Sequence, residues 1–284
     1  MAVLRWTFCV ILVLLYVILL AETRPTGKRP QRPPLPLLFY VNPNNSDLLQ
    51  GDIMVRSGSQ LERFAIYTVV KDSSKVWPDA KVYYTISPDF DVDLDQPLIK
   101  EAMALVEEKT CVKFIERKDE PDYISIEFRE GRCASHVGKE GGEQTLALDF
   151  SYCPGKGQMA HEFMHALGFF HEHCRPDRDD YIDIKWDNVQ DGGEHNFKLR
   201  SETVAETYGQ AYDYESVMHY PYDTYSKDKS LPTIVARDPS ISAAQLGKGY
   251  LDDYLTETDI IKVNKLYNCP PKTQPDREDK NAFT

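Results

Sequence analysis

The sequence predicts an α+β fold for a chain of 284 residues. Residues 81–86 and 123–128 alternate along the chain and are rich in β-branched and aromatic side chains, which is typical of strands. Apolar residues recur at helical spacing over 98–106, between the two expected strands. No internal repeat interrupts this order. The length suits one domain of about 200 residues with appendages.

Three helices are expected from spacing and capping signals. The first follows Asp95, which can cap it, and Pro97 can lie in its first turn. The second runs from about 158 to 167, after two Gly- and Pro-bearing breaks. The third spans 257–266 with Thr256 as its N-cap. The stretch between the second and third helices has little periodicity, and we expect irregular structure there.

The N-terminal region is predicted to serve export and processing. A charged start precedes an apolar stretch that ends at Ala21 and is shorter than the roughly 20 residues that span a bilayer, as in secretory signal peptides. An uncleaved signal anchor, with the protein held at a membrane, is the alternative. The proline-rich residues 22–67 form a linker or pro-segment, with an N-glycosylation acceptor at Asn44. Residues 270–284 form a short polar tail.

Charge and cysteine content narrow the class further. A net charge of −12 argues against binding to nucleic acid, because an acidic surface repels phosphate backbones. Apart from Cys9 in the signal segment, five cysteines remain, and an oxidising compartment would leave two disulfides and one thiol. The pairing cannot be read from the number of cysteines. We therefore expect a secreted, extracellular protein.

The most informative segment is 161–172, which reads HEFMHALGFFHE. On a helix, His161 and His165 lie one turn apart on one face and can reach the same ion. Gly168 can adopt the positive φ that ends a helix, so that the chain turns and His171 returns as a third ligand. Three imidazoles hold zinc and leave a position open for water, which is the arrangement of a catalytic site.

Two other interpretations compete with a catalytic site. A closed structural zinc site would recruit a fourth ligand, and Cys174 is the one thiol close enough in sequence. A secreted binding protein could keep the scaffold without activity, but such a protein is expected to have lost catalytic residues. Hydrolysis of a peptide would separate this second interpretation from an enzyme.

The segment resembles the astacin family of metzincin zinc endopeptidases. The resemblance rests on the three histidines with Glu172, on the Arg-Pro-Asp-Arg-Asp stretch 175–179 and on Ser-x-Met-His-Tyr at 216–220, and it covers about 68–269. It implies a two-lobed zincin fold, with a twisted sheet and the active-site helix in the N-terminal lobe and an irregular C-terminal lobe. It also implies a secreted zymogen whose mature domain cleaves protein or peptide substrates through a zinc-activated water.

Roles for single residues follow from the same resemblance. One Zn²⁺ per chain would be bound by three histidines, His161, His165 and His171. Glu162 would be the general base, and Met218 would form a turn beneath the metal. Tyr220 would be a labile fifth ligand that moves to stabilise the transition state. Glu172 would meet the new N-terminus of the mature enzyme.

The resemblance also implies a pairing of the cysteines. The disulfides would be Cys111–Cys269 and Cys133–Cys153. Cys174 is then left over, where the family usually has Ser. We favour a buried thiol in a monomer; an intermolecular disulfide is the alternative.

Residues 49–52 resemble the family's pro-segment motif, whose Asp, here Asp52, takes the position of the zinc's water. Trp77 and Pro78 match the start of the mature domain, but Tyr67 stands where an Arg usually precedes the mature N-terminus. Lys139 could favour an acidic residue just after the scissile bond, but we favour a solvated loop lysine, because Glu140 and Glu143 would partly cancel its charge.

Overall fold

A computed structural model describes residues 48–55, 73–199 and 207–271. The expected signal peptide 1–21, Asn44, Tyr67 and most of the expected pro-segment and tail lie outside the described residues. Within the described ranges, no helix combines the length and the apolar character needed to cross a bilayer.

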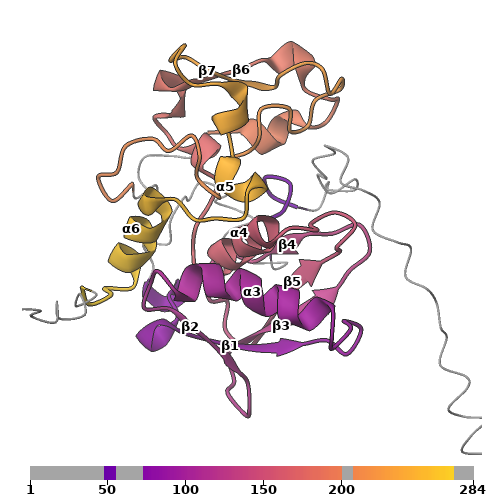
Figure 1. Ribbon diagram of the computed structural model, residues 1–284, viewed down its shortest axis with the longest axis vertical. Helices are drawn as coiled ribbons and strands as arrows, with labels where there is room; N and C mark the ends of the chain where they lie inside the picture. Colours follow the sequence, from indigo (N-terminus) through magenta and orange to yellow (C-terminus); the bar gives the residue numbers. More distant parts are fainter. Residues whose placement is uncertain (1–47, 56–72, 200–206, 272–284) are drawn as a thin grey trace, which may run out of the picture. The chain divides into compact units, whose positions relative to one another are not determined.

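A five-stranded sheet forms the base of the N-terminal lobe (Figure 1). Its strands lie in the order β2-β1-β3-β5-β4, and only β4 runs antiparallel to its neighbour. Their bounds are β1 Lys81–Ile86, β2 Lys113–Glu116, β3 Tyr123–Phe128, β4 Ala134–Ser135 and β5 Glu143–Leu148. The two predicted strands, β1 and β3, are confirmed and pair with each other in the sheet.

Helices α3 (Asp95–Glu107) and α4 (Lys156–Ala166) pack with the sheet in one apolar core. Ile99 of α3 and Phe163 of α4 are both fully buried in it. Trp77 precedes β1 in the chain, and its indole N–H donates to Ala166 O at 2.9 Å. This bond satisfies a carbonyl at the C-terminus of α4 that no helical N–H reaches.

The expectation that Asp95 caps α3 is wrong. The N-cap is Leu94, and Asp95 is the first helical residue. The carboxylate of Asp91 accepts the N–H groups of Asp93 and Leu94 at 2.9 Å each, while the buried Asp95 carboxylate accepts the N–H of Asp91 at 3.0 Å. The acidic residues thus build a turn ahead of the helix, which a single-residue capping signal does not describe.

The C-terminal lobe is mostly irregular, as expected. It contains the antiparallel pair β6 (Ile182–Ile184) and β7 (Ile234–Ala236), packed in a second apolar cluster, and the short helix α5 (Lys248–Leu251). Single 3-10 turns make up much of the rest of the described regular structure in both lobes: Ser73–Lys75, Pro78–Ala80, Glu172–Cys174, Arg178–Asp180, Trp186–Asn188, Glu194–Phe197 and Ala243–Gln245.

Helix α6 (Glu257–Leu266) returns the chain to the core of the N-terminal lobe, where Val263 is fully buried. Thr256 caps it, as predicted, by accepting the N–H of Asp259 at 3.0 Å. The disulfide Cys111–Cys269 ties the chain just beyond α6 to the segment after α3, and Cys133–Cys153 closes a loop before α4. Both disulfides have the pairing that the resemblance implies.

Candidate metal centre

The end of α4 turns the chain so that His171 faces the two helical histidines. Gly168 has φ +110°, and its N–H donates to His165 O at 2.8 Å, while Phe169 N donates to Met164 O at 3.1 Å. These two bonds form a Schellman motif, which requires a left-handed residue at the position of Gly168. The predicted role of this glycine is therefore confirmed.

The Nε2 atoms of the three histidines meet around the carboxylate of Asp52. Asp52 oxygens lie 3.3 Å from His161 Nε2, 3.4 Å from His165 Nε2 and 3.1 Å from His171 Nε2. One potential ligand atom from each of the four residues lies within 4.8 Å of every other. Among the described residues, these four form the one cluster of His, Cys, Asp and Glu side chains that could hold a metal ion.

The outer nitrogens of the histidines are held by oxygen acceptors. His161 Nδ1 lies 2.8 Å from Val217 O, His165 Nδ1 lies 2.6 Å from Phe169 O, and His171 Nδ1 lies 3.2 Å from the side-chain oxygen of Gln50. An acceptor at Nδ1 places the proton there and leaves the Nε2 lone pair for a metal.

The donor set fits a zinc ion. His165 Nε2 and one oxygen of Asp52 are buried without a hydrogen-bond partner, although buried polar atoms are usually satisfied. Burial lowers the pKa of His171 to about 3 despite the nearby Asp52 carboxylate, and it also lowers the pKa of His165. These two imidazoles are therefore neutral near pH 7, which is the form that binds metal.

Glu162 lies beside this centre on α4 and is buried. Burial raises the pKa of Glu162 well above its ordinary value, and the charge on Asp52 adds to this rise. One of its carboxylate oxygens has no hydrogen-bond partner in the described structure. A carboxyl group with a raised pKa next to a candidate metal centre is suited to act as a general acid or base.

A tight turn at 216–219 supports His161. Val217 O accepts from the ring of His161, and the N–H of Met218 donates to Ser216 Oγ at 3.0 Å. Met218 is buried, and its carbonyl oxygen accepts the N–H of Glu172 at 2.8 Å. Met218 therefore lies in a turn that links the segments of two histidines.

Tyr220 faces the candidate metal centre from the C-terminal lobe. Its ring centroid lies 4.7 Å from that of His171 and 3.9 Å from that of His173. Its hydroxyl donates to Gln50 O in a short hydrogen bond. Burial raises the pKa of Tyr220 well above its ordinary value, so the hydroxyl stays protonated and able to donate.

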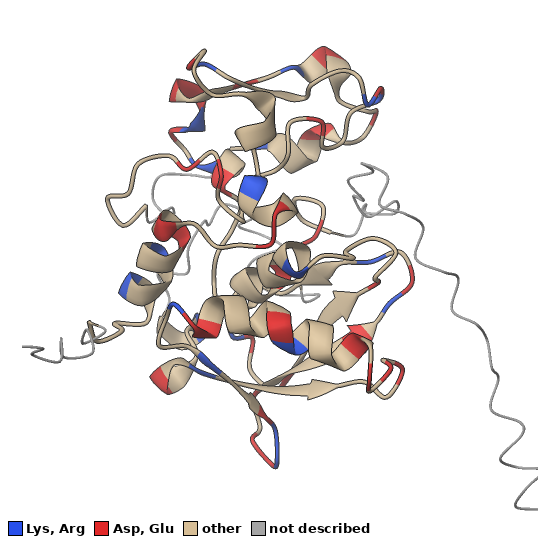
Figure 2. Cartoon of the chain, viewed as in Figure 1, with Lys and Arg blue, Asp and Glu red and all other residues tan. Residues whose placement is uncertain are grey.

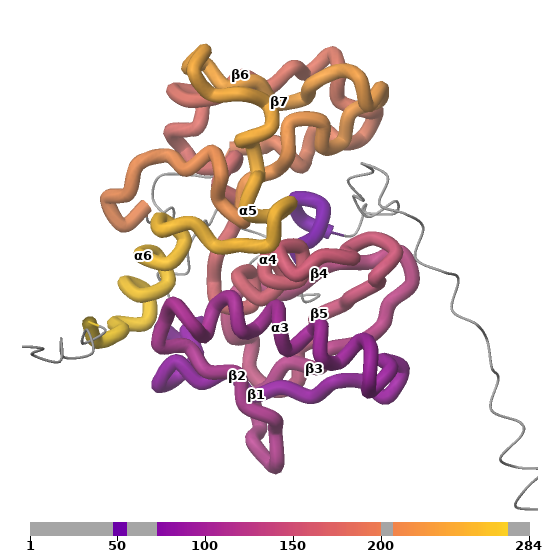
Figure 3. Tube along the Cα trace, in the orientation of Figure 1, coloured from indigo at the N-terminus to yellow at the C-terminus, as the bar shows by residue number. Residues whose placement is uncertain are grey.

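Residues 48–55 lie across the centre and pair with the edge of the sheet. Figure 3 shows this segment in indigo beside β4 and α4. Leu49 and Ile53 form a short bridge, and Ser135 of β4 donates its N–H to Asp52 O at 2.9 Å and accepts from Met54 N at 2.8 Å. Ile53 is fully buried. The segment is thus both paired and packed against the domain.

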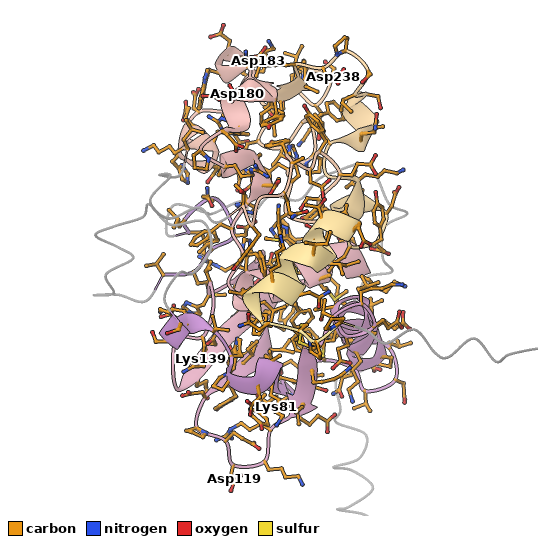
Figure 4. All side chains as sticks on the ribbon, turned by 90° about the vertical axis from the view of Figure 1, so that its left-hand side faces the viewer. Lys81, Asp119, Lys139, Asp180, Asp183 and Asp238 are labelled. Atoms are coloured by element: carbon orange, nitrogen blue, oxygen red, sulfur yellow. A yellow bond between two sulfur atoms is a disulfide. The ribbon has the colours of Figure 1, made fainter. Side chains whose placement is uncertain are left out.

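Two further predictions concern side chains away from the ligands. Cys174 is fully buried and takes part in neither disulfide, which agrees with the favoured prediction of a buried thiol. Lys139 lies at the periphery of the N-terminal lobe (Figure 4) and pairs with Asp122 at 2.8 Å. Because Asp122 already pairs with its charge, the less favoured interpretation, in which Lys139 selects an acidic substrate residue, finds no support.

Several contacts of the centre were not predicted from sequence. Gln50, in the motif at 49–52, accepts from His171, and Asp259 accepts from the turn at 216–219. The ring of Tyr250 lies edge-on to His161 with centroids 5.2 Å apart. Tyr250 belongs to α5. This helix packs closely on α4 at Gly157, where a Cβ would lie only 2.7 Å from the carbonyl oxygens of Gly249 and Tyr250, so only a glycine allows the approach. No local motif marks these contacts.

The sheet, the helix end and the three-histidine centre define a metzincin-type protein. Residues 69–268 match the model of the peptidase family described as "Astacin". The chain belongs to this astacin family of zinc metalloendopeptidases.

Known relatives agree with this assignment. The chain is 38% identical over 248 residues to zinc metalloproteinase nas-14 of Caenorhabditis elegans, which covers 79% of this chain and 48% of the relative. It is 38% identical over 230 residues to astacin-like metalloprotease toxin 1 of Loxosceles intermedia, which covers 79% of this chain and 82% of the toxin. The chain spans about half the length of nas-14 and of nas-7, a second nematode relative.

A solved structure shows the same fold. High choriolytic enzyme 1, a hatching enzyme zinc-protease from the medaka fish Oryzias latipes, aligns with a TM-score of 0.64 at 32% sequence identity. The alignment covers 71% of this chain and 100% of the fish enzyme.

Proposed function

We propose that this protein is a zinc-dependent endopeptidase that is secreted as a zymogen. The observation that carries the proposal is the convergence of His161, His165 and His171 Nε2 atoms on one carboxylate, with each Nδ1 held by an acceptor. Bound zinc would polarise a peptide carbonyl and lower the pKa of a bound water toward about 7.

The protein's own residues supply proton transfer and charge stabilisation. Glu162 takes a proton from the attacking water and passes it to the leaving amine, a task suited to a carboxyl group with a raised pKa. Tyr220 leaves Gln50 O when residues 48–55 depart and donates its hydroxyl to the tetrahedral oxyanion. A single donor of this kind contributes roughly 3 kcal/mol to transition-state stabilisation.

Latency comes from residues 48–55. Asp52 places its carboxylate among the three Nε2 atoms, where water would otherwise bind. Backbone pairing with Ser135 and burial of Ile53 hold the carboxylate there. Residues 22–67 therefore act as a pro-segment, and 68–269 is the catalytic domain.

Export is supported by the cysteines. Two disulfides in one domain are typical of a protein in an oxidising compartment. A signal peptide at 1–21 would direct the chain to such a compartment. Asn44 would then carry a glycan. We propose a monomer that acts on protein or peptide substrates, and the burial of Cys174 argues against an intermolecular disulfide through this residue.

The test replaces Glu162 by alanine in the full chain, activated by limited proteolysis upstream of residue 68. We expect Glu162→Ala to keep its fold and its zinc, measured by circular dichroism and metal analysis, and to lose cleavage of casein. Glu257→Ala, which changes an exposed glutamate, is the matched control and should cleave like the wild type. Casein cleavage retained by Glu162→Ala would contradict the proposed base, and wild-type protein that cleaves equally without zinc would contradict the proposed function.

A further inference from the structure

Helix α6 carries two buried charged side chains one turn apart. Asp259 is 1% exposed and Lys262 is 6% exposed. On the same helix, Glu257 and Lys265 are exposed, and Figure 2 shows acidic residues at its start and basic residues further along. Burial of a charge is costly unless the group is paired and hydrogen-bonded, so the partners of these two residues indicate their role.

Lys262 reaches the segment of the third histidine. Its Nζ lies 2.7 Å from one carboxylate oxygen of Glu172, the residue that follows His171. The other oxygen of Glu172 accepts from Arg175 Nη1 at 2.9 Å and from Asp213 N at 3.1 Å. Both carboxylate oxygens of Glu172 are thus held, directly beside a metal-binding residue.

Asp259 reaches the turn that orients the first histidine. Its carboxylate accepts from Ser216 Oγ at 2.6 Å and from Val217 N at 2.9 Å. Val217 O in turn accepts from His161 Nδ1 at 2.8 Å. One residue therefore separates the carboxylate of α6 from the imidazole.

The contacts made by Lys262 and by Asp259 are connected to each other, and the end of α6 is anchored by a disulfide. Glu172 N donates to Met218 O at 2.8 Å, so the segment held by Lys262 and the turn held by Asp259 also bind each other. The disulfide Cys111–Cys269 fixes the chain just beyond α6 to the segment after α3, which lies 158 residues earlier in the sequence.

We propose that Asp259 and Lys262 are positioning residues for the metal centre, through which α6 holds His161 and His171 in register with His165. This inference rests on the proposed zinc function. Neither side chain touches the ion or the substrate; each fixes the backbone beside a histidine. Groups that orient metal-binding histidines typically change metal affinity by 10- to 100-fold when they are removed.

The test compares four variants of the full chain. Asp259→Asn and Lys262→Met remove the buried charges, and Glu257→Gln and Lys265→Met remove exposed charges from the same helix. Zinc affinity is measured by competition with a chromogenic chelator, and the visible spectrum of the Co²⁺-substituted protein reports the geometry of the histidines. We expect about tenfold weaker zinc binding and an altered Co²⁺ spectrum in the first two variants. The two control variants should stay within about twofold of the wild type.

A conservative variant separates positioning from general folding. Lys262→Arg keeps the charge and should restore most of the zinc affinity that Lys262→Met loses. If Asp259→Asn fails to fold, the comparison of Lys262→Met with Lys262→Arg decides. Zinc binding by Lys262→Met within twofold of the wild type would overturn the inference. A wild-type protein that binds zinc but does not cleave casein even after proteolytic removal of the residues upstream of 68 would contradict the proposed function, and this measurement on the full chain would remain valid.

Discussion

Gly51 lies in the 48–55 segment at a position where a side chain does not fit. Its φ is +89°, a backbone conformation that other L-residues rarely adopt. A Cβ at this position would lie 2.0 Å from Tyr225 Oη and 2.9 Å from Tyr220 Oη. We therefore expect Gly51→Ala to loosen the segment from the domain.

The magnitude follows from two separate costs. The left-handed backbone costs an alanine about 1–2 kcal/mol, and overpacking against a buried hydroxyl costs about 1–3 kcal/mol more. Together these amount to about 2–5 kcal/mol. Under the proposed zymogen mechanism the segment leaves while the domain stays folded, so the cost should appear as a local opening equilibrium that is larger by about 30- to 4,000-fold.

Amide hydrogen exchange measures this opening directly. The N–H groups of Ile53 and Met54 donate to Leu49 O and Ser135 O at 2.9 and 2.8 Å, and they should lose protection in Gly51→Ala. Gly142→Ala is the matched control, because Gly142 also has a positive φ of +68° but nothing lies within 4 Å of its Cβ position. Adding Tyr225→Phe to Gly51→Ala should restore part of the protection by removing the clashing oxygen. Equal protection of these amides in Gly51→Ala and Gly142→Ala would refute the steric argument.

Two further predictions concern stability. Burial, together with the charge on Asp259, raises the pKa of Asp213 to about 6. The stability that this group contributes to the folded state is therefore complete below about pH 4, where the carboxyl is protonated, and is lost as the pH rises through 6. In urea unfolding, the free energy of unfolding of Asp213→Asn should rise by about 2 kcal/mol relative to that of the wild type between pH 4 and pH 7. If the free energies of the two proteins ran parallel over this pH range, the prediction would be contradicted. The disulfides Cys111–Cys269 and Cys133–Cys153 join residues 158 and 20 positions apart, so chain entropy predicts losses of about 5 and about 3 kcal/mol when each pair is replaced by alanine. Thermal unfolding that ranked the two pairs in the opposite order would argue against the entropic account.

Part of the fold could be predicted from local patterns. Strands β1 and β3 and helix α6 were found because their apolar residues follow a clear period and α6 has a cap. Strand β5 was missed because Leu146, Ala147 and Leu148 are all buried, so the strand does not alternate. Strand β4 has only two residues and no pattern of its own.

The residues of the metal centre likewise fall into a group that the sequence predicts and a group that it does not. His161, His165 and His171 lie within one short segment, so spacing alone predicts that they converge. Their supports come from far along the chain: Gln50 lies 121 residues from His171, and Val217 lies 56 residues from His161. Such contacts depend on tertiary packing, which a single sequence does not reveal without a motif.

The pairing of Asp52 and Met54 with Ser135 also affects solubility. Strand β4 is the last strand of the five-stranded sheet, and its outer backbone groups would otherwise be a template for pairing with another molecule. While the segment is in place, that edge is covered and aggregation through it is blocked. Departure of the segment would therefore expose an unpaired strand edge together with the metal centre.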